Sequence, residues 1–215
     1  MRDTYRHKGM RRKLVEELRE KGIQDERILQ AFMQLPRHYF LDDAFDEWAY
    51  QDKPFPIGNE QTISQPYTVA FQTALLNVEP GQKILEIGTG SGFQAAILAL
   101  LGTNVNTIER HQELSEKAEL LLGKIGIKRV RCFFGDGYVG LPNLAPFDRI
   151  LLTCGASEIP EALCKQLKIG GQMVVPVGDK VQSMYRITRT SPQSFEREQF
   201  GDFRFVPFLK GKAGQ

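Results

Sequence analysis

The feature that most constrains this chain is a glycine-rich turn between an apolar segment and a helical one. Residues 83–87 have the composition of a buried strand, and the apolar run 95–101 has that of a helix. The turn between them carries Gly88, Gly90 and Gly92. A chain that leaves a strand and enters a helix within a few residues needs backbone angles that glycine adopts at little steric cost. Such a strand–turn–helix unit is typical of folds that cradle a nucleotide-like ligand.

The spacing of these glycines argues against a dinucleotide. The dinucleotide fingerprint G-x-G-x-x-G ends in a small residue that lets the helix pack closely, and here that position is Phe93. The carboxylate of Glu86, just before the turn, is poorly placed beside a phosphate and better suited to hold an amino group through water or backbone. We therefore expect a smaller, less anionic nucleoside-like ligand, with a plain structural corner as the alternative.

Two acidic residues follow the next two expected strands. Glu109 ends a short strand about twenty residues beyond the glycine turn, where ribose-binding α/β folds place an acid that accepts hydrogen bonds from the ribose hydroxyls. Asp136 lies between Gly135 and Gly137 after a third strand and is free to accept from an exocyclic amine such as that of adenine. The alternatives are a solvated carboxylate near a helix start for Glu109 and an ordinary Asp-Gly turn for Asp136.

The alternation of apolar and helical segments predicts a Rossmann-like, doubly wound and mostly parallel α/β sheet with helices on both faces. An N-terminal helical cover and C-terminal antiparallel strands complete it. We expect one domain over 1–215, divided into a helical and substrate-site segment (1–80), a cofactor-binding core (81–178) and C-terminal strands (179–215). The expected strands lie near 83–87, 104–108, 129–134, 148–153 and 172–177, with hairpin strands at 184–190 and 200–206. The expected helices lie at 11–21, 25–35, 92–101, 112–125 and 159–168, the last of them closed by residues 167–171.

Composition adds limits on location and partners. A net charge of +2 over 215 residues gives no reason to expect nucleic acid or membrane. The three cysteines contain no C-x-x-C pair, so reduced core thiols and the cytoplasm are expected. The three histidines show no ligand spacing, so no metal is expected. The basic residues near the N-terminus are interpreted as a solvated face: Arg2, Arg6, Lys8, Arg11, Arg12 and Lys13.

Taken together, these motifs resemble class I S-adenosylmethionine-dependent methyltransferases. The block Gln61–Tyr67 (QTISQPY) narrows the resemblance to the protein-L-isoaspartate O-methyltransferase family, as do residues 90–96, 174–178 and 204–208. The resemblance runs from about residue 11 to about residue 210. Phe93, where tyrosine is common, and the segment 154–156, where alanines are common, depart from the family pattern.

The resemblance implies methyl transfer from S-adenosylmethionine to the free α-carboxylate of L-isoaspartyl residues in damaged proteins and peptides. The methyl ester then collapses toward a succinimide, which begins repair. A monomer with no nucleic-acid or membrane partner is expected. Carried over by position, the implied cofactor contacts are Thr62, Ile63, Ser64, Gly88, Gly90, Gly92, Glu109, Arg110, Asp136 and Gly137. The implied substrate contacts are Ser64, Val206 and Pro207.

Ser64 is the residue that the resemblance assigns to catalysis, by positioning the reacting carboxylate. A carboxylate has a reference pKa near 4 and is already an ionised nucleophile at neutral pH, so alignment is needed more than a base. The alternative is structural, because a serine shortly before Pro66 is also a good helix cap. Other functions left open are a methyltransferase of this fold acting on a small molecule or RNA, and a non-catalytic nucleoside-binding module. A nicotinamide dehydrogenase is disfavoured by Phe93.

Overall fold

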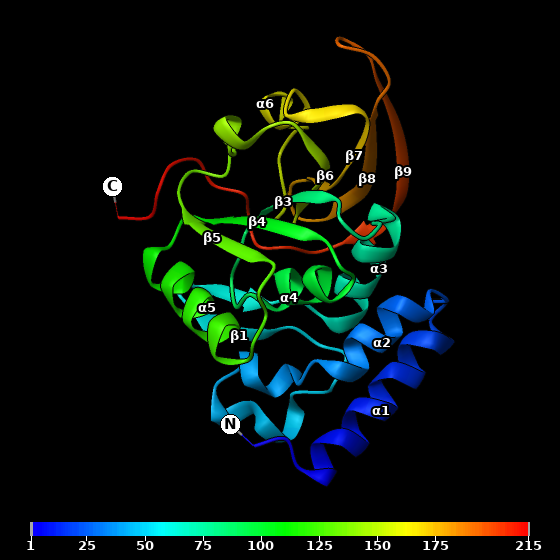
Figure 1. Ribbon diagram of the computed structural model, residues 1–215, viewed down its shortest axis with the longest axis vertical. Helices are drawn as coiled ribbons and strands as arrows, with labels where there is room; N and C mark the ends of the chain where they lie inside the picture. Colours follow the sequence, from blue (N-terminus) through cyan, green and yellow to red (C-terminus); the bar gives the residue numbers. More distant parts are fainter. Residues whose placement is uncertain (1, 215) are drawn as a thin grey trace.

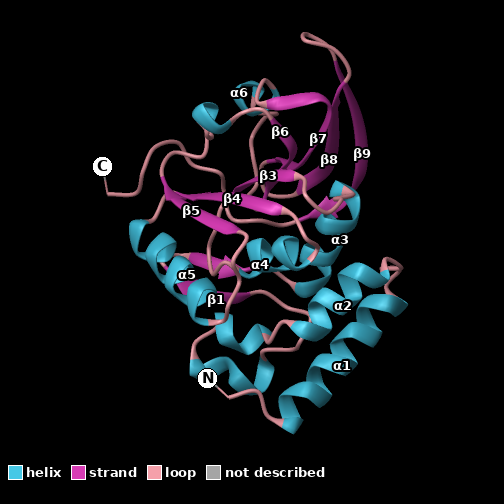
Figure 2. Cartoon of the chain, viewed as in Figure 1, coloured by secondary structure: helices cyan, strands magenta, loops and turns pink. Residues whose placement is uncertain are grey.

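The computed structural model describes residues 2–214 and is built around a seven-stranded sheet of order β5-β4-β3-β6-β7-β8-β9. Figures 1 and 2 show its elements, which are α1 (Tyr5–Glu20), α2 (Glu26–Gln34), η1 (Arg37–Phe40), η2 (Asp43–Trp48), β1 (Phe55–Gly58), β2 (Gln61–Ile63), α3 (Pro66–Leu76), β3 (Lys83–Ile87), α4 (Phe93–Leu100), β4 (Asn104–Glu109), α5 (Gln112–Lys124), β5 (Val130–Phe134), η3 (Pro142–Leu144), β6 (Phe147–Leu152), α6 (Glu161–Cys164), β7 (Leu167–Gly178), β8 (Gln182–Arg189) and β9 (Phe195–Phe203). Among residues 2–214, none of these helices combines the length and the apolar character that crossing a membrane requires.

The strands β3 to β7 run parallel, and β8 and β9 add two antiparallel strands at one edge. The chain moves outward from β3 through β4 to β5, then returns to the other side of β3 with β6 and β7. The order of the strands therefore reverses between β3 and β6. Ligands in open α/β sheets bind outside the carboxyl ends of the strands at such a reversal. The predicted doubly wound, mostly parallel sheet is confirmed.

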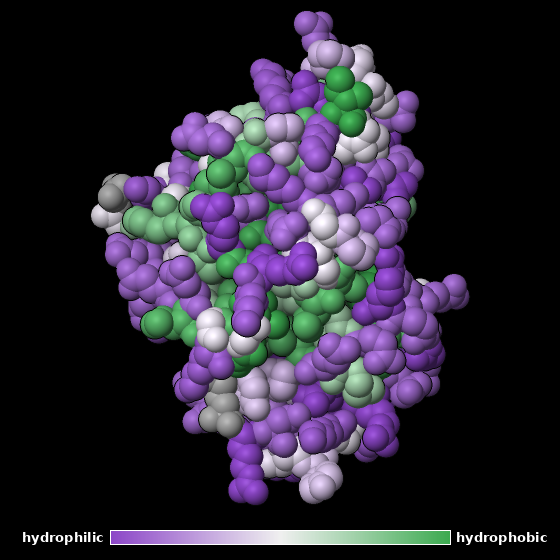
Figure 3. Space-filling model, viewed as in Figure 1, coloured by the Kyte–Doolittle hydropathy of each residue, from purple (hydrophilic) through white to green (hydrophobic). Residues whose placement is uncertain are grey.

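Layers of helices cover the sheet. The helices α3 and α4 pack on one face, where Ile84, Val105 and Leu151 join their apolar side chains. The short α6 and the C-terminal residue Phe208 contribute to the apolar cluster that includes Leu85 and Ile87. The helices α1 and α2 lie against α3 and α4 as the predicted N-terminal cover, seen at the bottom of Figure 1. Figure 3 shows a band of apolar residues across the middle of this view, with more hydrophilic surface above and below.

The helix predicted over 159–168 is wrong in most of its length. Only Glu161–Cys164 are helical, and the segment 167–171, which was expected to close that helix, is the first part of the twelve-residue strand β7. Pairing with β6 begins at once, since the Phe147 amide donates to the Gln166 carbonyl at 2.8 Å and Phe147 pairs with Leu167. Two glycines and the β-branched Ile169 also disfavour a helix there. Pairing with β6 therefore makes residues 167–171 a strand instead of the end of a helix.

The ends of the chain also differ from expectation. The first helix begins at Tyr5, about one and a half turns before the expected start, with Thr4 as its N-cap. The last strand spans Phe195–Phe203, so the residues 204–206 that were expected to continue it lie beyond its end. This earlier ending matters for the site, because it releases the C-terminal segment to cross the sheet.

Arg11 corrects the interpretation of the basic N-terminus. The other five basic residues there are exposed, but Arg11 is buried. Its guanidinium donates two hydrogen bonds to the Asp3 carboxylate, at 2.9 and 3.3 Å, and one to the Tyr50 hydroxyl at 3.1 Å. Burying a charge is unfavourable unless it is paired and hydrogen-bonded, and these partners meet that need. Arg11 therefore anchors α1 to the segment that precedes β1.

Candidate active site

The glycine turn between β3 and α4 lies at the carboxyl edge of the sheet, next to the end of β6. Gly88 has φ +96°, and a Cβ built there would lie 2.5 Å from the Thr153 hydroxyl oxygen. That hydroxyl donates to the carbonyls of Ile87 and Gly88 at 3.0 and 2.7 Å. Only glycine combines this left-handed backbone with so close a neighbour. The turn therefore packs closely against Thr153 at the end of β6, the neighbour of β3 in the sheet.

Gly92 is important for helix packing. It is the N-cap of α4 with φ +85°, and a Cβ there would lie 3.3 Å from the side chains of Ala118 and Leu122 on α5. Its missing side chain therefore serves the packing of α4 against α5. Gly92 is outside the residues that line the cavity described below. Its implied contact with the cofactor stays a prediction.

Glu109 ends β4 directly beside the turn and is buried. One carboxylate oxygen accepts the Gly90 amide at 2.9 Å, and the other accepts the His111 amide at 3.0 Å. A carboxylate has about four acceptor sites, so each oxygen keeps the capacity to accept one more donor. Two remaining acceptors on neighbouring oxygens match a pair of adjacent hydroxyls, as on a ribose.

A pocket at this edge has about 490 Å³ of space free of protein atoms, part of it open to solvent. Six of the predicted cofactor residues line it: Thr62, Ile63, Ser64, Gly88, Gly90 and Glu109. Val206, a predicted substrate residue, lines it as well. Residues from the loop before α3, from the glycine turn and from the C-terminal segment are thus brought together.

A smaller compartment of about 410 Å³ adjoins this pocket across Gly88, Glu109 and Cys154. Arg110, Gly137 and Pro207 line it. Asp136 lies beside it in the sequence but lines neither compartment, and its carboxylate accepts the Tyr138 amide at 2.9 Å. That bond is the Asp-Gly turn offered as the alternative from the sequence. The contact of Asp136 with an adenine stays a prediction.

The C-terminal segment closes the outer side of both compartments. Figure 1 shows it in red, running from β9 back across the sheet. The Gly155 amide donates to the Val206 carbonyl at 2.8 Å, and the Phe208 amide donates to the Gly155 carbonyl at 2.8 Å. Further along, the Ala213 amide donates to the Arg110 carbonyl at 2.9 Å. Val206 and Pro207 are therefore fixed over the carboxyl ends of β4 and β6.

Ser64 stands where two cavities meet. It lines the pocket with Glu109, and it also lines a wider cleft with about 1,140 Å³ of free space, which is walled by the start of α3 and the end of β9. The N-cap of α3 is Gln65, so the structural alternative offered for Ser64, that it caps this helix, is not what the structure has. Ser64 is half-buried, and within residues 2–214 its hydroxyl makes no hydrogen bond. A free hydroxyl at this junction is available to a ligand in either cavity.

Several lining residues were missed by the sequence reasoning. They are Gln61, Val69, Thr89, Ser91, Phe93, Gln94 and Thr153. Thr153 directly follows β6, and the rule that ligands bind at the carboxyl ends of strands could have identified it. The next residue, Cys154, lines the pocket as well. Burial raises the pKa of the Cys154 thiol, so it remains protonated at neutral pH and is no nucleophile.

Glu86 does not have the role expected of it. It lies on β3 one residue before Ile87, is fully buried, and lines neither compartment. Neither of its carboxyl oxygens has a hydrogen-bond partner among residues 2–214. Burial raises the pKa of Glu86 to about 8. Glu86 is therefore a neutral acid beneath the turn at pH 7, where it cannot reach an amino group in the pocket.

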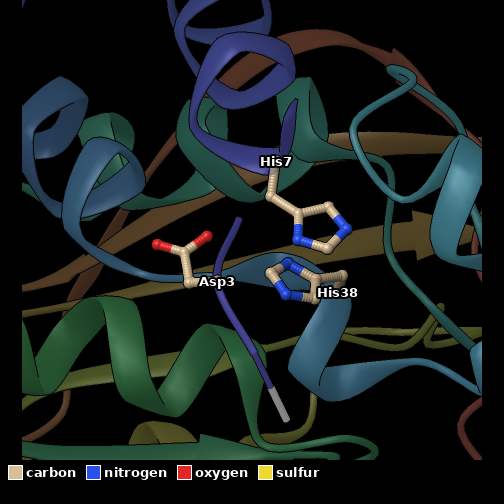
Figure 4. Close-up of side chains that lie close together, drawn as sticks. All are labelled: Asp3, His7 and His38. Carbon is tan, nitrogen blue, oxygen red and sulfur yellow. The ribbon is translucent and has the colours of Figure 1, made fainter. Parts of the chain in front are cut away.

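A separate polar cluster lies in the N-terminal layer (Figure 4). The rings of His7 and His38 stack with centroids 3.8 Å apart, and Asp3 lies beside them. The Asp3 carboxylate is already bound by Arg11, and His7 Nε2 lies 3.0 Å from the Asp46 carboxylate. One possible ligand atom from each of Asp3, His7 and His38 lies within 4.8 Å of the others. Both ring nitrogens of His7 are already engaged, however, Nδ1 with the Thr4 amide at 3.2 Å and Nε2 with Asp46. We therefore assign the cluster to packing of the N-terminal layer.

The charge of the main pocket suits S-adenosylmethionine. Among residues 2–214, its lining holds one ionisable acid, Glu109, and neither lysine nor arginine. A pyrophosphate would lack a cationic partner there, whereas a cofactor with a positive sulfonium and ammonium meets an acid. Glu109 lines both compartments, so its carboxylate can accept hydrogen bonds from the hydroxyls of a ligand that spans the two. The residues present therefore fit this cofactor.

Comparison with known proteins also indicates a methyltransferase, over nearly the whole chain. The family model described as Protein-L-isoaspartate(D-aspartate) O-methyltransferase matches residues 9–213. A protein-L-isoaspartate O-methyltransferase of Flavobacterium psychrophilum is 56% identical over 212 residues, which are 99% of this chain and 100% of that protein. One from Cytophaga hutchinsonii is 57% identical over 215 residues, covering 100% of this chain and 96% of the relative.

Solved structures of similar fold carry the same name. One protein-L-isoaspartate O-methyltransferase superposes with a TM-score of 0.84 at 30% identity, over 92% of this chain and 65% of that longer one. A putative one from Plasmodium falciparum, in complex with S-adenosyl-L-homocysteine, gives 0.82 at 25% identity over 95% and 98% of the two chains. The chain belongs to the protein-L-isoaspartate(D-aspartate) O-methyltransferase family.

Proposed function

We propose that the two compartments at the carboxyl edge hold S-adenosylmethionine and that Ser64 orients the acceptor carboxylate in the adjoining cleft. The reaction is that of a protein-L-isoaspartate O-methyltransferase: a methyl group passes from S-adenosylmethionine to the free α-carboxylate of an L-isoaspartyl residue. The resulting ester leads through a succinimide to repair of the damaged chain. When bound, the cofactor supplies an activated methyl group on a positively charged sulfur.

The residues at the carboxyl edge of the sheet each contact a different part of the cofactor in this proposal. Glu109 accepts the ribose hydroxyls with its two remaining acceptor sites. The backbone of Gly88 and Gly90 forms the wall of the pocket, with Thr62, Ile63 and Ser64 opposite. Arg110, Asp136 and Gly137 surround the adenine end, and Gly92 supports the turn from behind. The lining of the two compartments supports this division for all of these residues except Asp136 and Gly92, which line neither. The role of Glu109 is also supported by the two backbone amides that fix its carboxylate.

The acceptor needs alignment more than activation. A free α-carboxylate is ionised at neutral pH, so no general base has to remove a proton. Ser64 donates a hydrogen bond to one carboxylate oxygen and points the other toward the methyl group. Val206 and Pro207 lie over the substrate main chain and exclude water. Well-held geometry supplies about 7–11 kcal/mol in favourable cases.

The observation that carries this proposal is the junction at Ser64. Ser64 is half-buried and lines the cofactor pocket and the wider cleft at once, and within residues 2–214 its hydroxyl has no hydrogen-bond partner. A donor at that place sits between the two reacting molecules. Its neighbours Thr62, Thr153 and Val206 line both cavities as well, so the passage between them is short.

The activity is tested with two peptides that differ in one linkage. The purified protein is incubated with methyl-labelled S-adenosylmethionine and a peptide that contains either L-isoaspartate or L-aspartate at the same position. We expect base-labile label on the isoaspartyl peptide alone, because only its α-carboxylate is free. Label on neither peptide, in a protein that binds S-adenosylhomocysteine by calorimetry, would contradict the assignment of the acceptor.

The role of Ser64 is tested by its replacement with alanine. We expect kcat for the isoaspartyl peptide to fall about 100-fold, the loss typical of a misplaced reacting group. The affinity for S-adenosylhomocysteine and the melting temperature should stay close to those of the parent, since this hydroxyl supports no other described residue. The matched control is Ser191→Ala in the turn between β8 and β9, where the hydroxyl accepts the Gln193 amide at 3.4 Å and Ser191 lines neither cavity. Equal activity of the two variants would refute the positioning role.

We further infer that the enzyme acts on damaged proteins and peptides as a monomer in the cytoplasm, and that residues 1–215 form one methyltransferase domain. Exposed large apolar residues are scattered over distant elements, as Tyr5, Leu120 and Ile169 illustrate, which supports a monomer. The three cysteines are free, which suits a reducing compartment. Sedimentation equilibrium tests the state of assembly.

A further inference from the structure

The helix that follows Ser64 begins without a cap from its own sequence. Helix α3 starts at Pro66, and the side chain of its N-cap Gln65 makes no capping bond. The first amides of a helix lack partners within the helix and need an acceptor. Proline has no amide hydrogen, so the first donor that needs one is the amide of Tyr67.

Asp52 supplies that acceptor from fifteen residues upstream. Its Oδ1 accepts the Tyr67 amide at 2.7 Å, and its Oδ2 accepts the Gln65 side-chain amide at 2.9 Å. The ammonium of Lys21, at the end of α1, lies 2.6 Å from Oδ2. The Asp52 side chain is only 4% exposed, so a charge there needs such partners. One carboxylate thus joins the start of α3 to the N-terminal helical cover.

This arrangement decides what Ser64 can do. Serine is a preferred capping residue, and Ser64 lies three residues before the Tyr67 amide in the chain. With Asp52 on that amide, the Ser64 hydroxyl is left free, and Ser64 lines both cavities. Without Asp52, the Tyr67 amide would need another acceptor, because a buried donor without an acceptor is costly. The Ser64 hydroxyl, three residues earlier in the chain, is an acceptor of the type that caps helices.

We propose that Asp52 is a positioning residue of the methyl transfer: by capping α3 in place of Ser64, it keeps the Ser64 hydroxyl directed to the acceptor carboxylate. This inference rests on the proposed role of Ser64. Asp52 itself does not line the cofactor pocket or the cleft, so its effect on turnover passes through the loop 62–65 and the start of α3. Lys21 keeps the carboxylate in place from the other side.

The test compares Asp52→Ala with Asp52→Asn and with a control cap. We expect Asp52→Ala to lower kcat about 10- to 100-fold through misplacement of Ser64, while the affinity for S-adenosylhomocysteine changes less than about threefold. Asparagine is as good a cap as aspartate and keeps an acceptor for the Tyr67 amide, but its NH2 group faces the donors of Lys21 and Gln65. Asp52→Asn should therefore recover most, not all, of the kcat that Asp52→Ala loses. The control Asp25→Ala removes the cap of α2, where Asp25 accepts the Arg27 amide at 2.9 Å. It should lower the melting temperature without changing kcat.

A double-mutant cycle separates positioning from simple stability. If Asp52 acts through Ser64, the double variant Ser64→Ala with Asp52→Ala should be no slower than Ser64→Ala alone by more than about threefold, because coupled sites are not additive. Losses that multiply, or an Asp52→Ala enzyme that resembles Asp25→Ala, would overturn the inference while the role of Ser64 stands. A Ser64→Ala enzyme with the parent kcat would instead overturn the proposed function on which the inference rests.

Discussion

Replacing Glu109 with alanine is expected to weaken the binding of S-adenosylmethionine by about 100-fold or more. Hydrogen bonds to a charged acceptor contribute about 1.5–3 kcal/mol each, and two ribose hydroxyls lose their acceptor. The carboxylate also holds the Gly90 amide at 2.9 Å, so its loss loosens the turn that forms the wall of the pocket. Calorimetric titration of the parent and the variant with S-adenosylhomocysteine measures the change.

Two controls make this prediction specific to the ribose. Glu116→Ala removes an exposed acid from the neighbouring helix α5 and should leave the affinity unchanged. The second control varies the ligand: the 2′-deoxy analogue of S-adenosylhomocysteine should bind the parent about tenfold more weakly, a loss of one hydrogen bond. The Glu109→Ala enzyme should no longer distinguish the two ligands. If it still prefers the hydroxylated ligand tenfold, Glu109 is not the ribose acceptor.

The glycine turn and Glu109 could be placed together from the sequence, because their positions depend on segments that are close to each other in the chain. The glycine turn joins a strand to a helix within a few residues, and Gly88 needs its positive φ at that corner. Glu109 follows from the next strand, because parallel strands bring their carboxyl ends to one edge of the sheet. The pairing of Ile87 with Ile108 places the two segments side by side, so the acid meets the turn.

What could not be predicted depends on partners far away in the sequence. Ser64 has the residue type of a cap, and only the carboxylate of Asp52 shows why it is not one. Arg11 belongs to a basic run, and its burial follows from Tyr50, which is 39 residues away. The helix expected after residue 159 was wrong because pairing between β6 and β7 takes over at Leu167. In each case a tertiary contact outweighs a local preference.

Glu86 was interpreted from its position in the sequence beside the glycine turn, and the alternation of a strand explains why that failed. Successive side chains of a strand point to opposite faces, and all of β3 after Lys83 is buried. The Glu86 carboxyl group is therefore enclosed in the sheet layer rather than directed into the pocket. Such a group has a consequence for stability that can be measured as a function of pH.

The free energy of unfolding of the parent is expected to fall as the pH rises from about 4.5 to about 8, because of Glu86. In the Glu86→Gln variant, most of this decrease should be absent. Burial raises the pKa of Glu86 in the folded protein to about 8, from an ordinary value of 4.5. In that window the unfolded chain releases a proton that the folded protein keeps, so the free energy of unfolding falls by about 1.4 kcal/mol per pH unit. From pH 5.5 to pH 8 the group therefore costs about 3 kcal/mol.

Urea unfolding of both proteins at pH 5.5, 6.5, 7.5 and 8.5 measures this difference. The glutamine amide lacks the ionisation, so the variant should gain on the parent by about 3 kcal/mol across the series and level off above pH 8. A buried amide without partners costs about 1–3 kcal/mol, but that cost is the same at each pH and shifts the whole curve without changing its slope. The exposed Glu20→Gln serves as the control and should follow the parent. Parallel curves for Glu86→Gln and the parent would mean that Glu86 is ionised in the folded protein, and a cation or water would then have to reach it beneath the turn.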